Sequence, residues 1–596
     1  MQCYRLPEKI TYSSVSSARF KLYTFSRCTL PLSIYVVGKV ISGTKSDAVD
    51  DTGADTVDAS RAYTRNSVSN NVERRVSKAS KSIQEPDLKR TTSPGLMLPI
   101  FSAGLIAAAF LAYLYRHIFA SKASSLIAGT SEVMSQGLQN KKLQKDAEAR
   151  LNDFCDRLRN LPAVDLSAQN LGEEGTAYVV EALAFNPGCV SLDLSKNGVG
   201  KMGTSALSAV LPTSAIRNLV LNTNSVGDDG VEIMAKMLSG NSLIQNLDLG
   251  QNGIGDSGAL ALAEALKLNT SIKSLDLSGN GIDVNGAKAL ADALACNTSL
   301  KRINLSDNYI GEEGAMALAE SLKANTAIEE LLLKGNEIGD KGVTAICDAL
   351  KAREISPLIL DLGNNSISVV GADSIASMLS EKATKLTELN LYMNDISNAG
   401  AAKISEALKL CKAVRSLDLG GNNISHEGMQ AIANNIKGLE NLKILELGYN
   451  PLGAQGVKDI VDVAKFELKL DSLKLGWCKL GPEGACSVAD LLMFNSTLTS
   501  LDLRGNELGN DGAIILGRAF KSASTFKLAE LDLGYNEIKD EGACAIAQGL
   551  KGNAEAAPVD LKLNSNYITR FGQVALTEAV DLVYEMSKGK TMTIHF

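Results

Sequence analysis

The stretch LDLGQNGIGDSGALALAEAL, residues 247–266, decides the fold. In its first half, two leucines alternate with Asp248 and other polar or small residues, and this period of two predicts a short strand with inward-facing leucines. From Ala259 onward the apolar residues follow helical spacing, and Asp256 or Ser257 is placed to cap the first helical turn. A unit this short cannot bury its own leucines, so it needs neighbours of the same kind.

The same pattern returns along the chain at a nearly constant period. Stretches that begin at Leu275, Ile303, Leu331 and Leu501 align with it. One residue marks a fixed place in each copy, 27 to 30 residues after the previous mark and mostly 28. The marks are Gln169, Asn197, Asn224, Asn252, Asn280, Asn308, Asn336, Asn365, Asn394, Asn422, Asn450, Cys478, Asn506, Asn536 and Asn566. About fifteen repeats of about 28 residues therefore cover residues 161–596.

The pattern LxxLxLxx(N/C)xL, followed by a helical half, resembles the leucine-rich repeat. The 28-residue period and helices such as IGDSGALALAEAL resemble the ribonuclease-inhibitor-like subfamily of these proteins. Parallel strands stack about 4.8 Å apart, whereas packed helices need about 8–10 Å. We therefore expect an α/β solenoid curved like a horseshoe, with a parallel sheet on the concave face and helices on the convex face.

The marking asparagine has two N–H donors and a carbonyl acceptor, which suit backbone groups that no strand neighbour satisfies. Cys478 is expected to play a weaker version of this part, as in cysteine-bearing repeats of the family, and not to be a reactive thiol. Residues 131–160 are predicted to form an N-terminal capping helix, with a coiled-coil partner helix as the alternative. The final stretch KTMTIHF, residues 590–596, is suited to a terminal strand.

The N-terminal quarter has a different composition. Residues 1–46 are basic and rich in Ser and Thr, which is typical of an organelle transit peptide, and residues 47–95 are predicted to be a disordered linker. Residues 96–118 begin with an uncharged apolar run that ends in tyrosines and basic residues, and they predict one transmembrane helix. This organisation resembles plant plastid proteins of the ribonuclease-inhibitor-like group, including the embryo-defective class. We expect a chloroplast membrane location, with a mitochondrial membrane as the alternative.

The composition argues against several kinds of chemistry. Ten cysteines are scattered without a CxxC pair, and only three histidines are present. No P-loop, HExxH, GxSxG or kinase signature occurs. Residues 1–140 carry a net charge of +7 and residues 141–596 a net charge of −14, which opposes nucleic-acid binding by the repeats. We expect no catalysis, cofactor, metal or small-molecule substrate.

One candidate surface is a column of acids between the paired strand leucines. It consists of Asp165, Asp193, Asp248, Asp276, Asp361, Asp418, Glu446, Asp502 and Asp532. Neighbouring strands would hold two such acids about 5 Å apart, where like charges repel by about 1 kcal/mol or less in water. These acids are either common residues of such strands, stabilised by local hydrogen bonds, or an acidic trough that attracts a basic partner.

A second candidate surface follows the second strand leucine in four repeats. There the chain carries Tyr392, Met393, Tyr449, Trp477 and Tyr535, including its single tryptophan. Large side chains on a concave rim are typical of interface anchors. We therefore expect the aromatic residues to form the centre of a protein-binding surface, with the acids as charge around it.

The leading hypothesis is a membrane-anchored protein–protein interaction scaffold whose partner is an unidentified protein; an acidic trough would favour a basic one. One alternative is a regulator, inhibitor or activator, of another enzyme such as a GTPase or hydrolase. The other alternative is a cell-surface receptor, in which Asn269, Asn297 and Asn495 would be glycosylation acceptors.

Overall fold

In this computed structural model, the described residues are 158–596, except 159, 185, 354–357, 382–384, 524–526 and 588. The predicted segments 1–46, 47–95 and 96–118, and almost all of the predicted cap 131–160, lie outside these residues. Of that cap, Leu158 and Asn160 are described; the Leu158 side chain is buried in the core and Asn160 is exposed. No helix in the described part is both long and apolar enough to span a bilayer.

One parallel sheet runs through all the described repeats, with its strands in sequence order. Its sixteen strands are β1 (Ala163–Asp165), β2 (Ser191–Asp193), β3 (Asn218–Val220), β4 (Asn246–Asp248), β5 (Ser274–Asp276), β6 (Arg302–Asn304), β7 (Glu330–Leu332), β8 (Ile359–Asp361), β9 (Glu388–Asn390), β10 (Ser416–Asp418), β11 (Ile444–Glu446), β12 (Ser472–Lys474), β13 (Ser500–Asp502), β14 (Glu530–Asp532), β15 (Asp560–Lys562) and β16 (Thr593–His595). The last strand, β16, confirms that the C-terminal stretch extends the sheet.

A helix follows each of the first fifteen strands. The helices are α4 (Gly172–Leu183), α5 (Lys201–Val210), α6 (Gly227–Leu238), α7 (Asp256–Leu268), α8 (Val284–Cys296), α9 (Gly311–Ala324), α10 (Gly339–Ala352), α11 (Val369–Leu379), α12 (Ser397–Leu408), α13 (His426–Ile436), α14 (Gly453–Ala464), α15 (Gly481–Phe494), α16 (Gly509–Ser522), α17 (Asp540–Gly552) and α18 (Arg570–Met586). Short 3₁₀ turns, η1 (Leu211–Thr213) and η2 (Ala554–Ala556), follow α5 and α17.

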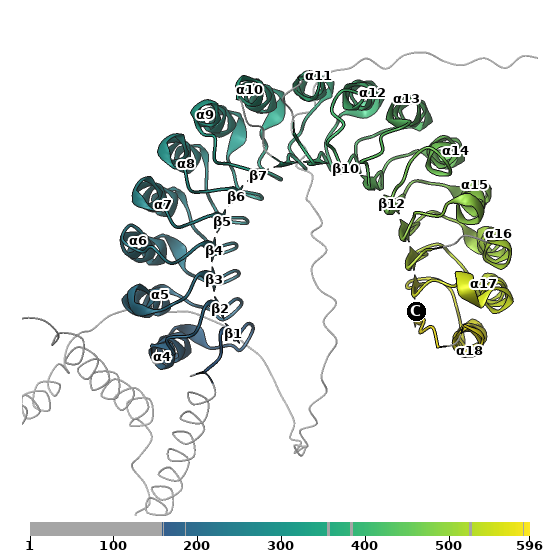
Figure 1. The fold of residues 1–596 in the computed structure, drawn as a ribbon, viewed down its shortest axis with the longest axis horizontal. Helices are drawn as coiled ribbons and strands as arrows, with labels where there is room; N and C mark the ends of the chain where they lie inside the picture. The colour runs from purple at the N-terminus through teal and green to yellow at the C-terminus, as the bar shows by residue number, and fades with distance from the viewer. Residues whose placement is uncertain are drawn as a thin grey trace, which may run out of the picture. The chain divides into compact units, whose positions relative to one another are not determined.

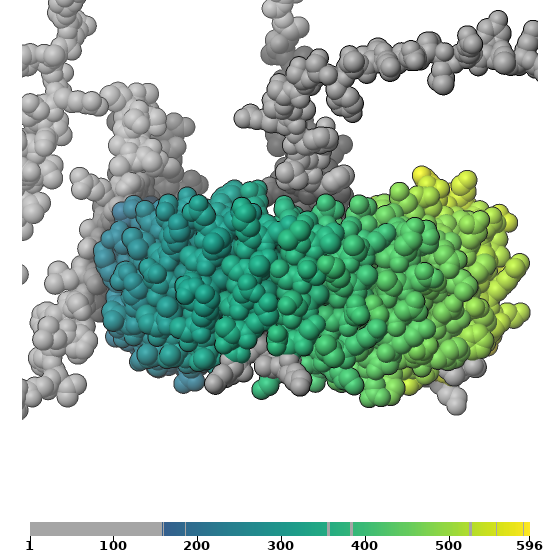
Figure 2. Space-filling view, turned by 90° about the horizontal axis from the view of Figure 1, so that it is seen from above, coloured from purple at the N-terminus to yellow at the C-terminus, as the bar shows by residue number. Residues whose placement is uncertain are grey.

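The repeats bend into an arc with the strands inside and the helices outside (Figure 1). This confirms the curvature expected from the different spacings of strands and helices. Successive repeats follow one another in sequence order along the outer surface (Figure 2). The described part is therefore an α/β solenoid in which each repeat packs on its two neighbours.

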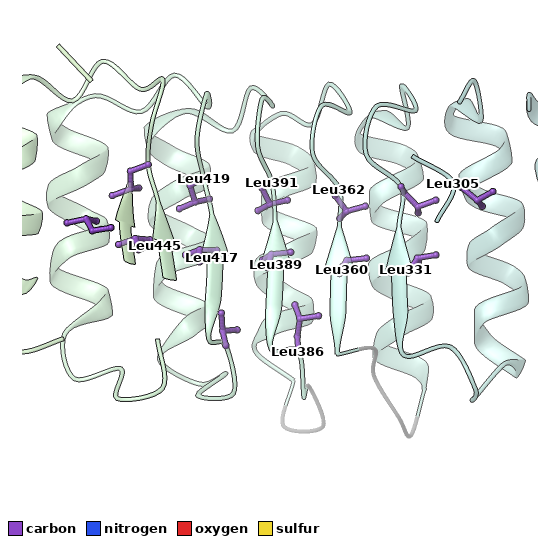
Figure 3. Close-up of a cluster of buried hydrophobic side chains, with 14 of the residues drawn as sticks. Leu305, Leu331, Leu360, Leu362, Leu386, Leu389, Leu391, Leu417, Leu419 and Leu445 are labelled. Carbon is purple, nitrogen blue, oxygen red and sulfur yellow. The ribbon is translucent and has the colours of Figure 1, made fainter. Parts of the chain in front are cut away.

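The strand leucines form the core in continuous rows. Leu360, Leu389 and Leu417 lie in one row across neighbouring strands, and Leu362, Leu391 and Leu419 lie in a second row (Figure 3). All six are at most 2% exposed. Burying a leucine side chain contributes about 2 kcal/mol, so stacking supplies the burial that one repeat cannot supply alone.

The marking asparagines join each repeat to the preceding one. The side-chain amide of Asn450 donates to the carbonyl oxygens of Leu419 and Leu447, both at 2.9 Å. Its Oδ1 accepts from the backbone N–H groups of Asn422 at 2.9 Å and Ile424 at 3.0 Å. Asn450 is fully buried, so these bonds satisfy backbone groups that water does not reach. The predicted role of the asparagine is confirmed.

Cys478 fills the same place with a weaker group. Its thiol donates to the Leu447 carbonyl oxygen at 3.4 Å, and the sulfur is a weak acceptor for the Asn450 N–H. Burial raises the pKa of Cys478 to about 12, so the thiol is not ionised at neutral pH. These contacts confirm a structural part for this residue.

Replacing Cys478 with asparagine, the residue that most other repeats carry at this position, is expected to stabilise the solenoid. In Cys478→Asn, a carbonyl oxygen would replace the sulfur as acceptor and should raise the free energy of unfolding by about 1 kcal/mol. Urea denaturation followed by circular dichroism measures the change. Cys486→Asn, at an exposed position of α15, is the matched control and should give no gain. A loss of stability in Cys478→Asn would contradict the expectation.

The prediction that Asp256 or Ser257 caps its own helix is wrong. The N-cap of α7 is Gly255, and no side chain of the repeat bonds to it. Instead, Oδ1 of Asp228 in the preceding repeat accepts from the N–H groups of Gly255 at 2.7 Å and Gly258 at 3.0 Å. Asp256 acts in the same way on the next repeat. At α7 and α8, an acceptor for the first N–H groups of the helix therefore comes across the repeat boundary.

Candidate protein-binding surface

The acids of the concave column have a structural part in the turn after each strand. All eight aspartates of the column accept, through Oδ1, from the backbone N–H two residues later; Asp165 and Asp193 accept from Ser167 at 2.9 Å and Ser195 at 2.8 Å, and the other six behave alike. The distances are 2.8–3.0 Å, and the donors are Gly250, Ser278, Gly363, Gly420, Arg504 and Gly534. Asp248 and Asp276 lie opposite each other in neighbouring strands, as predicted. The aspartate of the opening stretch therefore holds its own turn, which explains why the fold retains it.

Most of these carboxyl groups are only partly exposed, and burial changes their titration. Burial raises the pKa of Asp248, Asp361 and Asp502. Burial, reinforced by the neighbouring Glu446 carboxylate, raises the pKa of Asp418 to about 7. The column therefore carries less negative charge at neutral pH than its number of acids indicates.

Basic residues that the sequence analysis did not single out lie among the acids. Lys474 on β12 contacts Glu446 at 2.5 Å, and Arg504 contacts Asp502 at 2.9 Å. Lys474 occupies the strand position that carries an acid in most repeats. Arg504 occupies the next outward-facing position, where most repeats carry a small residue. Comparing basic as well as acidic residues between the repeats would have identified both from the sequence. Around β11–β13, acidic and basic side chains alternate from strand to strand, so the trough is not uniformly acidic there.

Tyr392, Met393, Tyr449, Trp477 and Tyr535 lie together at the carboxyl ends of their strands, and we call them the aromatic ladder. The rings of Tyr392 and Tyr449 meet edge to face at 6.2 Å between centroids, and Tyr449 stacks on Trp477 at 6.1 Å. Trp477 and Tyr535 are 5.6 Å apart. Trp477 is 40% exposed, Tyr449 45% and Tyr535 54%. Large stacked rings thus face solvent along several repeats.

Two repeats next to the large side chains carry glycine in place of a ring, and this leaves room for the large side chain of the preceding repeat. Gly505 lies between the repeats of Trp477 and Tyr535, and a Cβ added there would lie 2.3 Å from the Trp477 ring. Gly421 likewise lies under the sulfur of Met393, which an added Cβ would approach to 2.6 Å. Met393 and Trp477 therefore each extend over a glycine of the following repeat.

The backbone of the ladder is strained. Met393, Tyr449, Trp477 and Tyr535 have φ values between 55° and 61°, in the left-handed region. This conformation costs a residue with a side chain roughly 1–2 kcal/mol. It recurs at the same place in other repeats, where glycine, as at Gly279, or a polar residue, as at Gln251, occupies it. The fold would accept glycine here, so the rings are not required for folding.

Two rings of the ladder and the charged groups border one concave hollow of about 310 Å³. Its lining includes Tyr392, Tyr449, Asp418, Glu446, Lys474 and Arg504. Of the predicted site residues, Asp502 also borders it, whereas Asp248 and Asp276 lie several strands away on β4 and β5. Asp361 borders an adjoining hollow that shares Asp418 and Glu446. Within the described residues, no group of three or more His, Cys, Asp or Glu side chains is placed to hold a metal ion.

Removing the charge of Asp418 is expected to stabilise the fold at higher pH. Its folded pKa of about 7 lies above the unfolded value of about 3.9, so stability falls as pH rises from about 4 to about 7. In Asp418→Asn the amide oxygen can still accept the Gly420 N–H, as Asn390 accepts from Tyr392 at 2.8 Å. The variant should gain about 2 kcal/mol at pH 8, discounted for partial exposure.

Urea denaturation between pH 5 and pH 8 measures this difference. The gain should grow up to about pH 7 and then level off. Asp165→Asn is the control, because the Ser167 N–H lowers the pKa of Asp165 and no such gain is expected. A pH-independent difference between Asp418→Asn and the wild-type protein would contradict the assignment.

The three asparagines predicted as glycosylation acceptors in a receptor have a structural part. Asn269, Asn297 and Asn495 are 3%, 5% and 7% exposed. Their side-chain amides donate at 2.7–2.8 Å to the carbonyl oxygens of Leu238, Leu266 and Ala464 in preceding repeats. A glycan on that nitrogen would break these buried bonds, so the folded solenoid does not offer the three sites.

Comparison with known proteins agrees with the repeat pattern. Nine segments match the family described as Leucine Rich repeat: residues 240–263, 268–291, 296–319, 324–347, 382–405, 411–433, 438–461, 494–517 and 526–547. No curated protein sequence matches the chain.

Several solved structures are similar at low identity. The yeast Rad7–Elc1 complex is 14% identical, with coverage of 75% of this chain and 96% of that chain and a TM-score of 0.41. An internalin of Listeria monocytogenes is 16% identical, with coverage of 82% and 95% and a TM-score of 0.31. The TLR13–ssRNA13 complex is 18% identical, with coverage of 74% and 62% and a TM-score of 0.35. With values this low, the assignment depends on the nine matching segments and on the repeat geometry. The chain belongs to the leucine-rich-repeat family.

Proposed function

We propose that this protein is a protein–protein interaction scaffold that binds its partner through the aromatic ladder and performs no chemistry. Leucine-rich-repeat solenoids are typically interaction scaffolds of this kind. The observation that carries the proposal is the row of solvent-facing rings that contact one another along neighbouring repeats.

The chemistry of the ladder supports this proposal. Trp and Tyr are the residues most enriched among the energetic anchors of protein interfaces. The rings of Tyr449, Trp477 and Tyr535 already contact one another, so a partner would meet a surface that is ordered before binding. The paired charges beside the rings would form the polar rim of such an interface.

The test compares partner capture by full-length protein carrying ladder substitutions. Trp477→Gly and Tyr449→Gly remove a ring while giving the backbone the residue that its conformation favours. Cross-linking in cells followed by quantitative mass spectrometry should show at least a tenfold loss of the captured partner. Melting temperatures should stay close to that of the wild-type protein.

Tyr309→Ala is the matched control, because Tyr309 is an exposed tyrosine of another repeat that lies outside the ladder. It should capture the partner as well as the wild-type protein does. Retention of every captured protein by both ladder variants would overturn the proposal.

We further propose that residues 96–118 anchor the solenoid in a plastid membrane and that the repeats belong to the ribonuclease-inhibitor-like subfamily. The uncharged run and the transit-like composition of residues 1–46 support the anchoring. The 28-residue period supports the subfamily. A fluorescent fusion should label the plastid envelope or thylakoids, and the protein should resist alkaline carbonate extraction. Release by carbonate would exclude the anchor.

A further inference from the structure

Two tyrosine rings of the ladder form a corner at the concave hollow. The planes of Tyr392 and Tyr449 make an angle of 77°, with 6.2 Å between the ring centroids. Both rings line the hollow of about 310 Å³. Aromatic rings set at an angle around an open space are the arrangement that proteins use to hold organic cations.

The floor between the rings is kept low by glycines. A Cβ added at Gly420 would lie 3.0 Å from Cδ2 of Tyr392 and 3.2 Å from Oδ1 of Asp418. A Cβ added at Gly448 would lie 2.9 Å from the Gly476 carbonyl oxygen. The space between the rings and the carboxyl group therefore exists because these repeats lack a side chain at that place.

One carboxyl group beside the corner lacks a cationic partner. Glu446 is paired with Lys474 at 2.5 Å, and Asp502 with Arg504 at 2.9 Å. Among the described residues, Asp418 makes no ion pair within 4.0 Å. Its Oδ1 accepts from the Gly420 N–H at 2.8 Å, and the neighbouring Glu446 carboxylate helps to raise its pKa. Glu446 and Asp502 are thus paired directly with cations, whereas no described cation lies within 4.0 Å of Asp418. The third cation of the lining, Lys334, lies over the Tyr392 ring. We take Asp418 as the acid that is open to a cation from a partner.

The chain itself shows that the Tyr392 ring attracts a cation. The ammonium nitrogen of Lys334 lies 5.7 Å from the centre of this ring. A guanidinium is better suited than an ammonium to the remaining space, because it is planar, stacks on aromatic faces and donates two parallel hydrogen bonds to one carboxylate.

We propose that the hollow binds an arginine side chain of the partner protein, with its guanidinium held by Asp418 and the rings of Tyr392 and Tyr449. This inference depends on the proposed scaffold function and identifies the chemistry of the partner. Arginine is also among the residues enriched at the centres of interfaces. The arginine would enter the hollow while the rest of the partner covers Trp477 and Tyr535.

The single tryptophan of the chain provides the measurement. Trp477 stacks on Tyr449 at 6.1 Å, so a ligand in the corner changes its surroundings. The full-length protein is titrated with the peptide Gly-Ser-Gly-Arg-Gly-Ser-Gly, and the emission of Trp477 is recorded. The same peptide with citrulline, the neutral analogue of arginine, or with lysine gives the comparison.

We expect saturable binding of the arginine peptide that is at least tenfold tighter than binding of the citrulline and lysine peptides. Asp418→Asn and Tyr392→Leu should each weaken it about tenfold. Asp248→Asn is the matched control, because Asp248 occupies the same strand position and has a raised pKa but lies outside the hollow. Equal binding of the citrulline or lysine peptide, or unchanged binding by Asp418→Asn, overturns the proposal.

The two proposals fail separately. If Asp418→Asn leaves peptide binding unchanged while Trp477→Gly loses the captured partner, the arginine site is wrong and the scaffold function stands. If the peptide binds through Asp418 while both ladder glycine variants keep every partner, the ladder is not the docking surface.

Discussion

Asn450→Ala is expected to lower the free energy of unfolding by about 3 kcal/mol. The substitution removes two N–H···O bonds to the carbonyl oxygens of Leu419 and Leu447 and two bonds from the N–H groups of Asn422 and Ile424. All of these groups lie where water does not reach, and a buried polar group left without a partner costs about 1–3 kcal/mol.

Denaturant unfolding measured by circular dichroism tests this expectation. Asn434→Ala provides the control, since Asn434 is exposed on α13 and alanine is the better helix former there. In a solenoid the stability depends on each repeat and its interfaces, so the transition of Asn450→Ala should also broaden or divide. A variant as stable as Asn434→Ala would show that the asparagine row does not hold the repeats together.

Gly549→Ala is expected to destabilise the protein by about 3 kcal/mol or more. Helices α16 and α17 approach each other through Gly517 and Gly549, and a Cβ on Gly549 would lie 2.1 Å from the Gly517 carbonyl oxygen. A backbone atom cannot move away as a flexible side chain can. The helices must separate, which disturbs the packing of both repeats, and overpacking of this kind costs about 1–3 kcal/mol or more.

Gly552→Ala is the control for Gly549→Ala, because it adds the same methyl group three residues further along α17. The Cβ added at that position meets Cγ of Lys521 at 2.9 Å, and this flexible side chain can turn away. Alanine also favours the helix over glycine by about 1 kcal/mol. Thermal unfolding of the two variants should therefore shift in opposite directions or by clearly different amounts. Equal melting temperatures would contradict the close approach of the two helices.

The fold was predictable because one physical requirement recurs in every repeat. Two strand leucines and a helical apolar face appear at a fixed period, and only stacking buries them. The marking asparagine was predictable for the same reason, since its amide suits unpaired backbone groups. Even Cys478 follows from its place in the period.

Contacts across repeat boundaries were harder to predict from the sequence. Asp228 and Asp256 cap the helices of the following repeats, and a single-repeat pattern does not reveal which helix a side chain reaches. The same applies to Lys474, whose pairing with Glu446 depends on the register of neighbouring strands. Burial of Asn269 likewise becomes visible only when the preceding repeat is in place.

The positions of the aromatic residues could be predicted, but their stacking could not. Their contacts depend on the left-handed backbone at Tyr449 and Trp477 and on the space above Gly421 and Gly505. These glycines are ordinary turn residues in the sequence. Their effect on the neighbouring repeat is a property of the assembled sheet. A binding role for the ladder stays a prediction.

The constant spacing of the repeats determines how the length of the aromatic ladder can change. Because every repeat adds one strand at a spacing of about 4.8 Å, duplication or loss of a whole repeat lengthens or shortens the ring row by a fixed increment without altering the core. A lineage could therefore adjust the reach of this surface to a larger or smaller partner by unequal crossing-over, while each leucine keeps its neighbours.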